Sequence, residues 1–148
     1  MKNNDFTMVI EVDQTPSQVF NALKHPAQWW SGEIHGSAEK PGDEFTYRYE
    51  DFHFSTQRIA EMIQDQKIVW LVTDSVINYV ADKREWTGTK IVFEIAEAGG
   101  KTQLRFTHLG LKPDIECYDS CSNSWRQLIQ QSLRSLISTG KGRNLQLA

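Results

Sequence analysis

The sequence predicts an α+β domain in which a curved antiparallel β-sheet wraps around a long C-terminal α-helix. Three observations predict this fold. Apolar residues recur at helical spacing close to the C-terminus, up to about residue 139. Several segments before that helix alternate apolar and polar residues, as strands with one buried face do. A helix with a single apolar stripe needs a large surface to cover, and the concave face of a twisted sheet offers one.

Length and composition fit one globular domain. The chain has 148 residues, enough to bury one substantial core. Hydrophobic residues make up 39% of it and charged residues 24%, which excludes disordered and membrane compositions. The formal net charge is -3 and no run of Lys or Arg occurs, so no general attraction to nucleic acid or anionic lipid is expected. We predict one domain over residues 1–148 that does not bind nucleic acid.

The N-terminus and the cysteines indicate a cytoplasmic protein. The opening MKNNDFTMVIEVD lacks the apolar stretch of a secretory signal. The apolar run from Ile68 to Val72 is too short to span a bilayer. With only Cys117 and Cys121, the chain lacks the disulfide framework common in small secreted domains. We therefore expect a cytoplasmic location and no membrane span.

A strand and two short helical segments are predicted first. Residues 6–12 form the strand, and Thr15 then caps a helix with Pro16 at its first position and Gln18 at capping-box spacing. The dipeptide His25-Pro26 ends this helix. A second helical turn carries residues 29–32. Because neighbours on a helix point in different directions, Trp29 and Trp30 are not expected to face inward together, and one indole should lie at the rim.

Antiparallel strands fill the middle of the chain. Period-two alternation begins at Phe45, Tyr47 and Tyr49. The strands that follow are expected at residues 53–63, 67–73, 86–96 and 102–109, with a hairpin at residues 98–100. The segment from Ser75 to Arg84 is ambiguous, since it is compatible with a further strand at residues 76–80 before a charged turn.

The C-terminal helix begins between Pro113 and Asp119 and runs to about Thr139, before Gly140 and Gly142. Its apolar stripe is expected to consist of Tyr118, Cys121, Trp125, Leu128, Ser132, Leu133, Leu136 and Ile137. The stripe mixes large side chains with the small Cys121 and Ser132. Small side chains are expected to keep the helix from filling the groove above the sheet.

This order of elements, together with particular segments, resembles the START-like (SRPBCC) superfamily and its helix-grip fold. Within it the chain is similar to the AHSA-type branch, named after homology to the ATPase activator of a heat-shock chaperone. The matching segments are residues 15–23 (TPSQVFNAL), 29–32 (WWSG), 41–45 (PGDEF), 86–91 (WTGTKI), 106–111 (FTHLGL), 117–119 with 121–125 (CYD, CSNSW) and 138–142 (STGKG). Members of the superfamily include lipid carriers, hormone receptors and polyketide cyclases, so the resemblance implies a fold more than a function.

The resemblance implies a cavity between the sheet and the C-terminal helix, and aromatic side chains are the main candidates to line it. We expect a small hydrophobic or amphipathic ligand in a pocket of about 300 Å³ or more. For any single aromatic residue ordinary core packing is the better explanation, and only the set as a whole, together with the resemblance, favours a cavity. The alternative is a space filled by side chains. The candidate lining residues are Trp29, Trp30, Tyr47, Tyr49, His53, Trp70, Phe93, Phe106, His108, Tyr118, Cys121 and Trp125.

A catalytic or metal site is only weakly indicated. His108 with Cys117 and Cys121 would make a thiol–imidazole pair or a metal site, but zinc needs four ligands and a nucleophilic cysteine needs an orienting third group. Asp119 is the nearest candidate for that group, and two small buried hydrophobes are the plainer interpretation of the cysteines. We predict no catalytic residue, metal or cofactor. The alternatives are a cyclase- or hydrolase-like enzyme using His53 or His108, and a co-chaperone-type protein-interaction domain, although no feature of the sequence indicates a protein partner.

Overall fold

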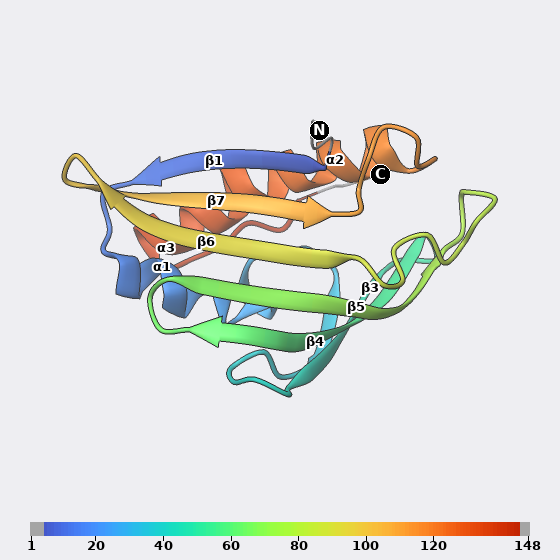
Figure 1. Ribbon diagram of the computed structural model, residues 1–148, viewed down its shortest axis with the longest axis horizontal. Coiled ribbons are helices and arrows are strands. Elements are labelled where there is room, and N and C mark those ends of the chain that lie inside the picture. Colours follow the sequence, from blue (N-terminus) through green and yellow to red (C-terminus); the bar gives the residue numbers. More distant parts are fainter. Residues whose placement is uncertain (1–4, 146–148) are drawn as a thin grey trace.

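An antiparallel sheet with a long helix across one face organises the computed structural model, which describes residues 5–145 (Figure 1). Within those residues seven strands pair in the order β1-β7-β6-β5-β4-β3-β2. The elements are β1 (Phe6–Val12), α1 (Pro16–Leu23), η1 (Pro26–Gln28), β2 (Glu33–Gly36), β3 (Glu44–Tyr49), β4 (His53–Ile63), β5 (Lys67–Ile77), β6 (Lys90–Ala98), β7 (Lys101–Leu109), α2 (Tyr118–Gln127), η2 (Leu128–Leu133) and α3 (Arg134–Thr139). The predicted helix-grip fold is confirmed. The prediction of one domain over residues 1–148 stays a prediction, because its two ends lie outside the described residues.

The last three elements form one continuous C-terminal helix from Tyr118 to Thr139. Its middle, η2, is a π-helical segment, a feature that shifts which side chains face the sheet. Trp125 and Leu128 are 1% exposed and Leu136 is 8% exposed, so the predicted apolar stripe is confirmed as buried, except for the half-buried Tyr118 at its start. Gly140 adopts a left-handed conformation, with φ of 85°, and ends the helix at the predicted place.

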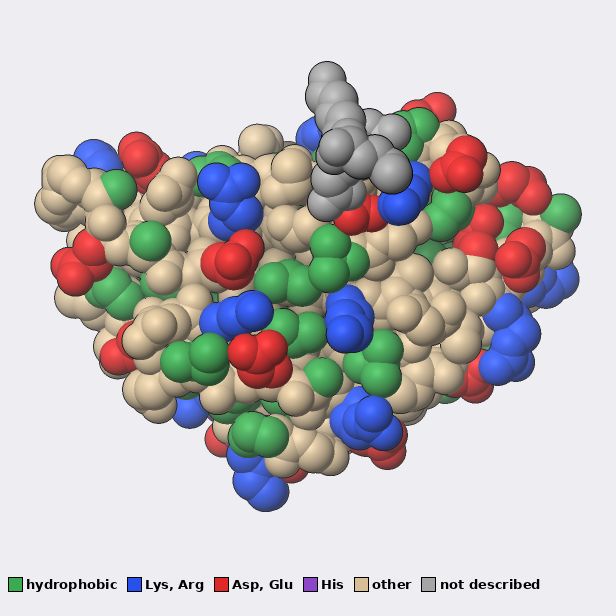
Figure 2. Space-filling model, in the orientation of Figure 1, with side chains coloured by type: hydrophobic (Ala, Val, Ile, Leu, Met, Phe, Trp, Pro, Cys, Tyr) green, Lys and Arg blue, Asp and Glu red, His purple; other side chains and the backbone are tan. Residues whose placement is uncertain are grey.

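The outer face of the sheet carries a mixture of side chains. Figure 2 shows hydrophobic groups there, interspersed with Lys and Arg and with Asp and Glu. Among residues 5–145 no helix is long and apolar enough to cross a membrane.

The start of α1 has the predicted capping box. The Thr15 hydroxyl accepts a hydrogen bond from the Gln18 backbone N–H at 3.2 Å, and the Gln18 side chain accepts one from the Thr15 backbone N–H at 2.9 Å. Pro16 occupies the first helical position, where it has no hydrogen bond to lose.

The two adjacent tryptophans contradict the prediction that one of them lies at the rim. Trp29 and Trp30 are both buried, and their rings stack with centroids 6.3 Å apart. The reason is that the 3₁₀ turn η1 ends at Gln28, so Trp29 and Trp30 follow it in non-helical backbone and are not held at helical angles.

Two strand boundaries differ from the prediction. β5 continues to Ile77, so no separate strand forms around residues 76–80. β6 begins at Lys90, and Trp86 lies in the preceding turn, where its carbonyl accepts a hydrogen bond from the Thr89 backbone N–H at 3.0 Å. The short edge strand β2 was not predicted, because three of its four side chains are exposed and show no alternation.

Ser132 does not open a groove as predicted. Its hydroxyl donates to the Trp29 carbonyl at 2.7 Å and accepts from the Arg143 backbone N–H at 2.9 Å. Gly142 packs so closely that a Cβ there would clash with the Gln28 carbonyl oxygen. The small residues at 132 and 142 thus let backbone segments approach one another and tie the C-terminal stretch to η1.

The change Leu136→Ala should lower the free energy of unfolding by about 2–5 kcal/mol, because it removes a buried side chain from the helix–sheet contact. Urea unfolding followed by circular dichroism measures it. The matched change Leu109→Ala removes the same atoms from a side chain that is 37% exposed, and should cost less than about 1 kcal/mol. Equal losses in the two variants would contradict the proposed packing.

Candidate functional site

A cavity of about 50 Å³ lies between the sheet and α2. Its lining is drawn from the residues after η1, β3, β4, the β5–β6 connection and the C-terminal helix, and consists of Trp30, Tyr47, His53, Tyr79, Trp86, Cys121, Ser124, Trp125 and Leu128. The cavity is smaller than the few hundred cubic ångströms that we predicted, because bulky aromatic side chains fill most of the space under the helix. Three larger hollows lie outside the helix–sheet interface: one of about 390 Å³ at the ends of β4–β7, one of about 260 Å³ beside η1, and one of about 110 Å³ between η1 and the residues around β2.

Five rings form a closed circuit around this cavity, which we call the aromatic cage: Trp30, Tyr47, His53, Trp86 and Trp125. Successive ring centroids lie 3.9 Å apart for Trp30 and Tyr47, 5.4 Å for Tyr47 and His53, and 4.3 Å for His53 and Trp86. Trp125 closes the circuit at 5.9 Å from Trp86 and 5.1 Å from Trp30. Three of these distances lie within the roughly 4.5–7 Å that is usual for interacting aromatic rings and two are shorter, so each ring of the cage packs against its neighbours.

Sequence reasoning found part of this lining. Of the twelve candidates, the structure brings five together at the cavity: Trp30, Tyr47, His53, Cys121 and Trp125. The remaining seven do not line it. Trp29, Trp70, Phe93 and Phe106 are core residues, His108 is completely buried, and Tyr49 and Tyr118 are half-buried at the edge of the core.

Four lining residues were missed. Leu128 and Ser124 share a helix face with Cys121, so helical spacing was a usable signal for both. Trp86 is one of the large aromatic residues that the sequence offers for such a pocket, but its predicted position in a strand did not distinguish it from core aromatics. Tyr79 lies in the β5–β6 connection, where no periodicity shows which way a side chain points.

His108 holds two cage tryptophans in place through a chain of hydrogen bonds. The Trp125 indole N–H donates to His108 Nδ1 at 3.1 Å. Since an indole only donates, Nδ1 is the acceptor and the imidazole proton lies on Nε2. Nε2 donates to the Thr89 hydroxyl at 2.8 Å, and that hydroxyl donates to the Trp86 carbonyl at 2.6 Å. The chain therefore links α2, β7 and the turn that carries Trp86.

Both buried histidines are neutral at pH 7. Burial lowers the pKa of His53 to about 4, and burial together with the nearby His53 lowers the pKa of His108 to about 3. His53 Nε2 and the Ser55 hydroxyl form a hydrogen bond of 3.3 Å.

The two cysteines are free and buried, and they do not pair with His108. Cys117 Sγ accepts a hydrogen bond from the Trp86 indole N–H at 3.3 Å, and the Cys117 backbone N–H donates to Glu85 at 2.9 Å. The hydrogen bond to Cys121 and burial raise the pKa of Cys117, whereas the bond from Cys117 lowers the pKa of Cys121. Because both ring nitrogens of His108 are already bonded, the thiol–imidazole interpretation is wrong. In the described part of the chain no group of three or more His, Cys, Asp or Glu could hold a metal.

Tyr79 covers the mouth of the cavity. It is 48% exposed, far more than the other aromatic lining residues. Its hydroxyl shares hydrogen bonds with Ser120 Oγ at 2.8 Å and with Cys121 Sγ at 3.5 Å. Burial raises the pKa of the Tyr79 hydroxyl, which stays protonated at neutral pH.

A strip of buried polar side chains runs from the cavity into the core on the concave face of the sheet. His53, Ser55 and Gln57 alternate along β4, and Ser75 lies opposite Ser55 on β5. Ser55, Gln57 and Ser75 are completely buried. The amide of Gln57 has no hydrogen-bond partner for either Nε2 or Oε1 among residues 5–145, and the same holds for the indole nitrogen of Trp70. An unpartnered buried polar group costs about 1–3 kcal/mol, so packing alone gives no reason for Gln57 to be there.

Comparisons with known proteins agree with the fold. Residues 13–138 match the family described as Activator of Hsp90 ATPase homolog 1-like protein. No curated protein matches the chain.

Several solved structures have a similar fold. The Aha1 dimer from Colwellia psychrerythraea has a TM-score of 0.74 at 21% identity, and the match covers 93% of this chain and 98% of that one. DynU16, a protein of the dynemicin biosynthetic locus, has a TM-score of 0.69 at 13% identity over 98% of this chain and 52% of its own. Protein SSP2350 from Staphylococcus saprophyticus has a TM-score of 0.66 at 17% identity over 95% and 98%. At these identities the likeness shows the fold alone.

Lowering the pH from 7.5 to 5 should destabilise the protein through its buried histidines. The folded state keeps His53 and His108 neutral down to about pH 4 and 3, whereas the unfolded chain takes up the protons near pH 6.5. Their contribution to stability is therefore complete above pH 6.5 and is lost as the pH falls, by about 2 kcal/mol for each histidine at pH 5. The variant His53→Gln should lose about 2 kcal/mol less than the wild type over this range in urea unfolding.

The control for this comparison is His35→Gln, because the His35 side chain is 79% exposed. It should show the same pH dependence as the wild type. A His53→Gln variant whose stability falls as steeply as the wild type between pH 7.5 and 5 would show that His53 is not held neutral in the fold.

Proposed function

This chain belongs to the family of Activator of Hsp90 ATPase homolog 1-like proteins, within the START-like superfamily, and from that premise we propose that it binds a small amphipathic molecule in the cavity beneath α2. The proposal rests on the composition of the site. Apolar surface comes from the rings of the cage and from Leu128, and polar atoms come from His53, Ser124 and Cys121. Such a mixture of apolar walls with a few polar groups is typical of ligand sites.

The observation that carries the proposal is the buried, unpartnered amide of Gln57. It lies on the concave face of β4, four residues from His53 of the cavity, with the buried Ser55 between them. A ligand whose polar group reaches this strip would give the amide the hydrogen bonds that the described residues do not supply. The strip therefore supports a ligand with at least one donor or acceptor as well as an apolar part.

Tyr79 is the side chain best placed to admit such a ligand. The cavity of about 50 Å³ is well below the ~300 Å³ of pockets that hold drug-sized ligands. Every other aromatic lining residue is buried and packs against neighbouring rings. Tyr79, in contrast, lies in the β5–β6 connection and is held by two hydrogen bonds near the surface. Rotation of this one side chain enlarges the mouth without disturbing the core.

Binding accounts for the titratable groups of the cavity better than catalysis does. A general acid or base works best when its pKa is close to the working pH. In this cavity burial moves the pKa of His53 down to about 4 and raises the pKa of Tyr47 and of Tyr79. None of these three groups is poised to exchange a proton at neutral pH. The fourth titratable lining group, Cys121, has its pKa lowered by the hydrogen bond from Cys117, but one thiol alone does not make an acid–base pair, which argues against the cyclase- or hydrolase-like alternative.

The apolar probe N-phenyl-1-naphthylamine is larger than the closed cavity, so its entry requires the rotation of Tyr79. With Tyr79 rotated, the probe should bind the folded protein saturably, with energy transfer from tryptophan. Ser124→Phe places a ring in the cavity and should abolish this binding, because so little free volume is available. The matched control Ser138→Phe puts the same ring on an exposed position of the same helix and should bind the probe like the wild type. Circular dichroism verifies that both variants fold.

Two results would contradict the proposal. One is the absence of saturable binding to the wild type, in which case a protein-interaction domain becomes the better account. The other is equal binding to Ser124→Phe and the wild type, which would place the probe outside the cavity.

The change Gln57→Leu should raise the free energy of unfolding by about 1–3 kcal/mol, because it replaces an unpartnered buried amide by an apolar side chain of similar size. Urea unfolding measures the effect, and Gln103→Leu on the outer face of β7 is the control, with little change expected. A clear loss of stability in Gln57→Leu would show that the amide is satisfied in the folded protein and serves its structure.

A further inference from the structure

We propose that the aromatic cage receives a methylated ammonium group, the cationic head of the small amphipathic ligand; this inference rests on the proposed function and specifies the class of its ligand. A cation over the face of an aromatic ring is attracted by the negative charge of the π system, most strongly for Trp. The cage contains three tryptophans, a tyrosine and an imidazole in a closed circuit. Tyr79 adds a sixth ring at the mouth.

The cage itself carries no charge that would repel a cation. None of the nine described lining residues is Lys, Arg, Asp or Glu. His53, the only histidine among them, is neutral at pH 7 because it is buried. An anionic head group would find neither a positive charge nor an attractive π face in this lining, so nothing would offset the cost of burying it.

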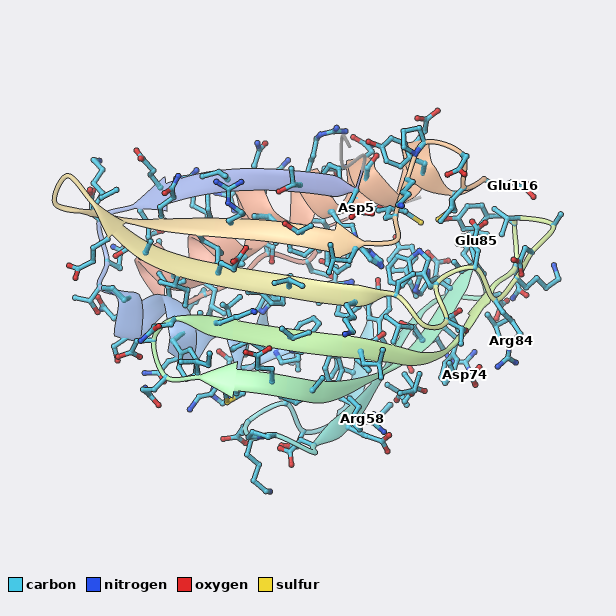
Figure 3. All side chains as sticks on the ribbon, viewed as in Figure 1. Asp5, Arg58, Asp74, Arg84, Glu85 and Glu116 are labelled. Atoms are coloured by element: carbon cyan, nitrogen blue, oxygen red, sulfur yellow. The ribbon has the colours of Figure 1, made fainter. Side chains whose placement is uncertain are left out.

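Acidic residues outnumber basic ones in the segments that flank the cage. Glu85 is bonded to the Cys117 backbone N–H, and Glu116 is bonded to the Ala81 backbone N–H at 3.2 Å. Figure 3 shows both glutamates at the same end, beyond the strands. The segments that flank the mouth, residues 78–88 and 110–121, contain five acidic and three basic residues, and one of the basic residues, Arg84, is paired with Asp74 at 2.7 Å. Figure 2 shows several acidic side chains at this end, with Lys and Arg side chains beside them. The electrostatic field of this net negative charge favours the entry of a cation.

Because the lining offers few hydrogen-bond acceptors, it favours a methylated ammonium group over a primary one. A primary ammonium has three N–H donors to satisfy, whereas a quaternary ammonium has none. Indole rings offer no acceptor. Tyr47, His53 and Tyr79 already form hydrogen bonds with Ser31, Ser55 and Ser120, so the Ser124 hydroxyl is the main acceptor left for three N–H donors. A group with apolar methyls and a diffuse charge suits such walls, and the volume of about 50 Å³ limits it to a few heavy atoms.

The test compares three probes on the wild-type protein by tryptophan fluorescence and calorimetry. Choline chloride carries the trimethylammonium group, 3,3-dimethylbutan-1-ol is its neutral isostere, and ethanolamine hydrochloride is the unmethylated cation. We expect choline to bind at least about 10-fold more tightly than the isostere, because several rings contribute to cation attraction, and more tightly than ethanolamine. Trp86→Leu should weaken choline binding about 10-fold and change isostere binding less, while Ser138→Phe should leave both unchanged.

The possible results distinguish an error in the class of ligand from an error in the binding site. If the isostere or ethanolamine binds as tightly as choline, the methylated cation is the wrong class. If none of the three binds while N-phenyl-1-naphthylamine does, the cation inference fails and the proposed function stands. If the naphthylamine does not bind either, the proposed function fails with it. The probe comparison uses the wild-type protein alone, so it decides between these outcomes even if the Trp86→Leu protein misfolds.

Discussion

The hydrogen bonds of His108 are the constraint on which the site depends. One neutral imidazole accepts from the Trp125 indole and donates to Thr89, whose hydroxyl reaches the Trp86 carbonyl. These bonds join the C-terminal helix, β7 and the turn before β6, three parts of the chain that are distant in sequence. A protonated His108 has no acceptor left for the indole, so the arrangement requires a neutral ring. Complete burial of His108 keeps the ring neutral, because burial lowers its pKa.

The same hydrogen bonds explain why a small cavity remains under the helix and the space is not filled by the hydrophobic core. Trp86 and Trp125 lie at fixed positions, and Trp30, Tyr47 and His53 close the circuit around a residual cavity. Deeper in the sheet most side chains are apolar and buried, apart from the polar strip that ends at Gln57. A protein that needed stability alone would place apolar side chains there. Retaining an unpartnered amide costs stability, and a ligand-binding role gives a reason for that cost.

The sequence predicted the fold well because periodicity and capping are local signals. The capping box at Thr15, the long strand β4 and the C-terminal stripe all follow from residue spacing. The site was predicted only in part. Trp86 and Tyr79 lie in the β5–β6 connection, whose backbone has no period that fixes side-chain direction. The close packing of Ser132 against distant backbone segments, and the volume that remains in the cavity, depend on tertiary contacts that spacing does not encode.

The most direct test of this account is the protonation state of His108, observed in a long-range proton–nitrogen correlation spectrum of the imidazole rings. The account predicts a neutral ring with the proton on Nε2 and a bare Nδ1, unchanged between pH 8 and pH 5, because burial lowers the pKa of His108 to about 3. The variant His108→Gln identifies the signal. A ring protonated on both nitrogens at pH 5, or one with its proton on Nδ1, would contradict the account, since neither form can accept the Trp125 indole hydrogen bond.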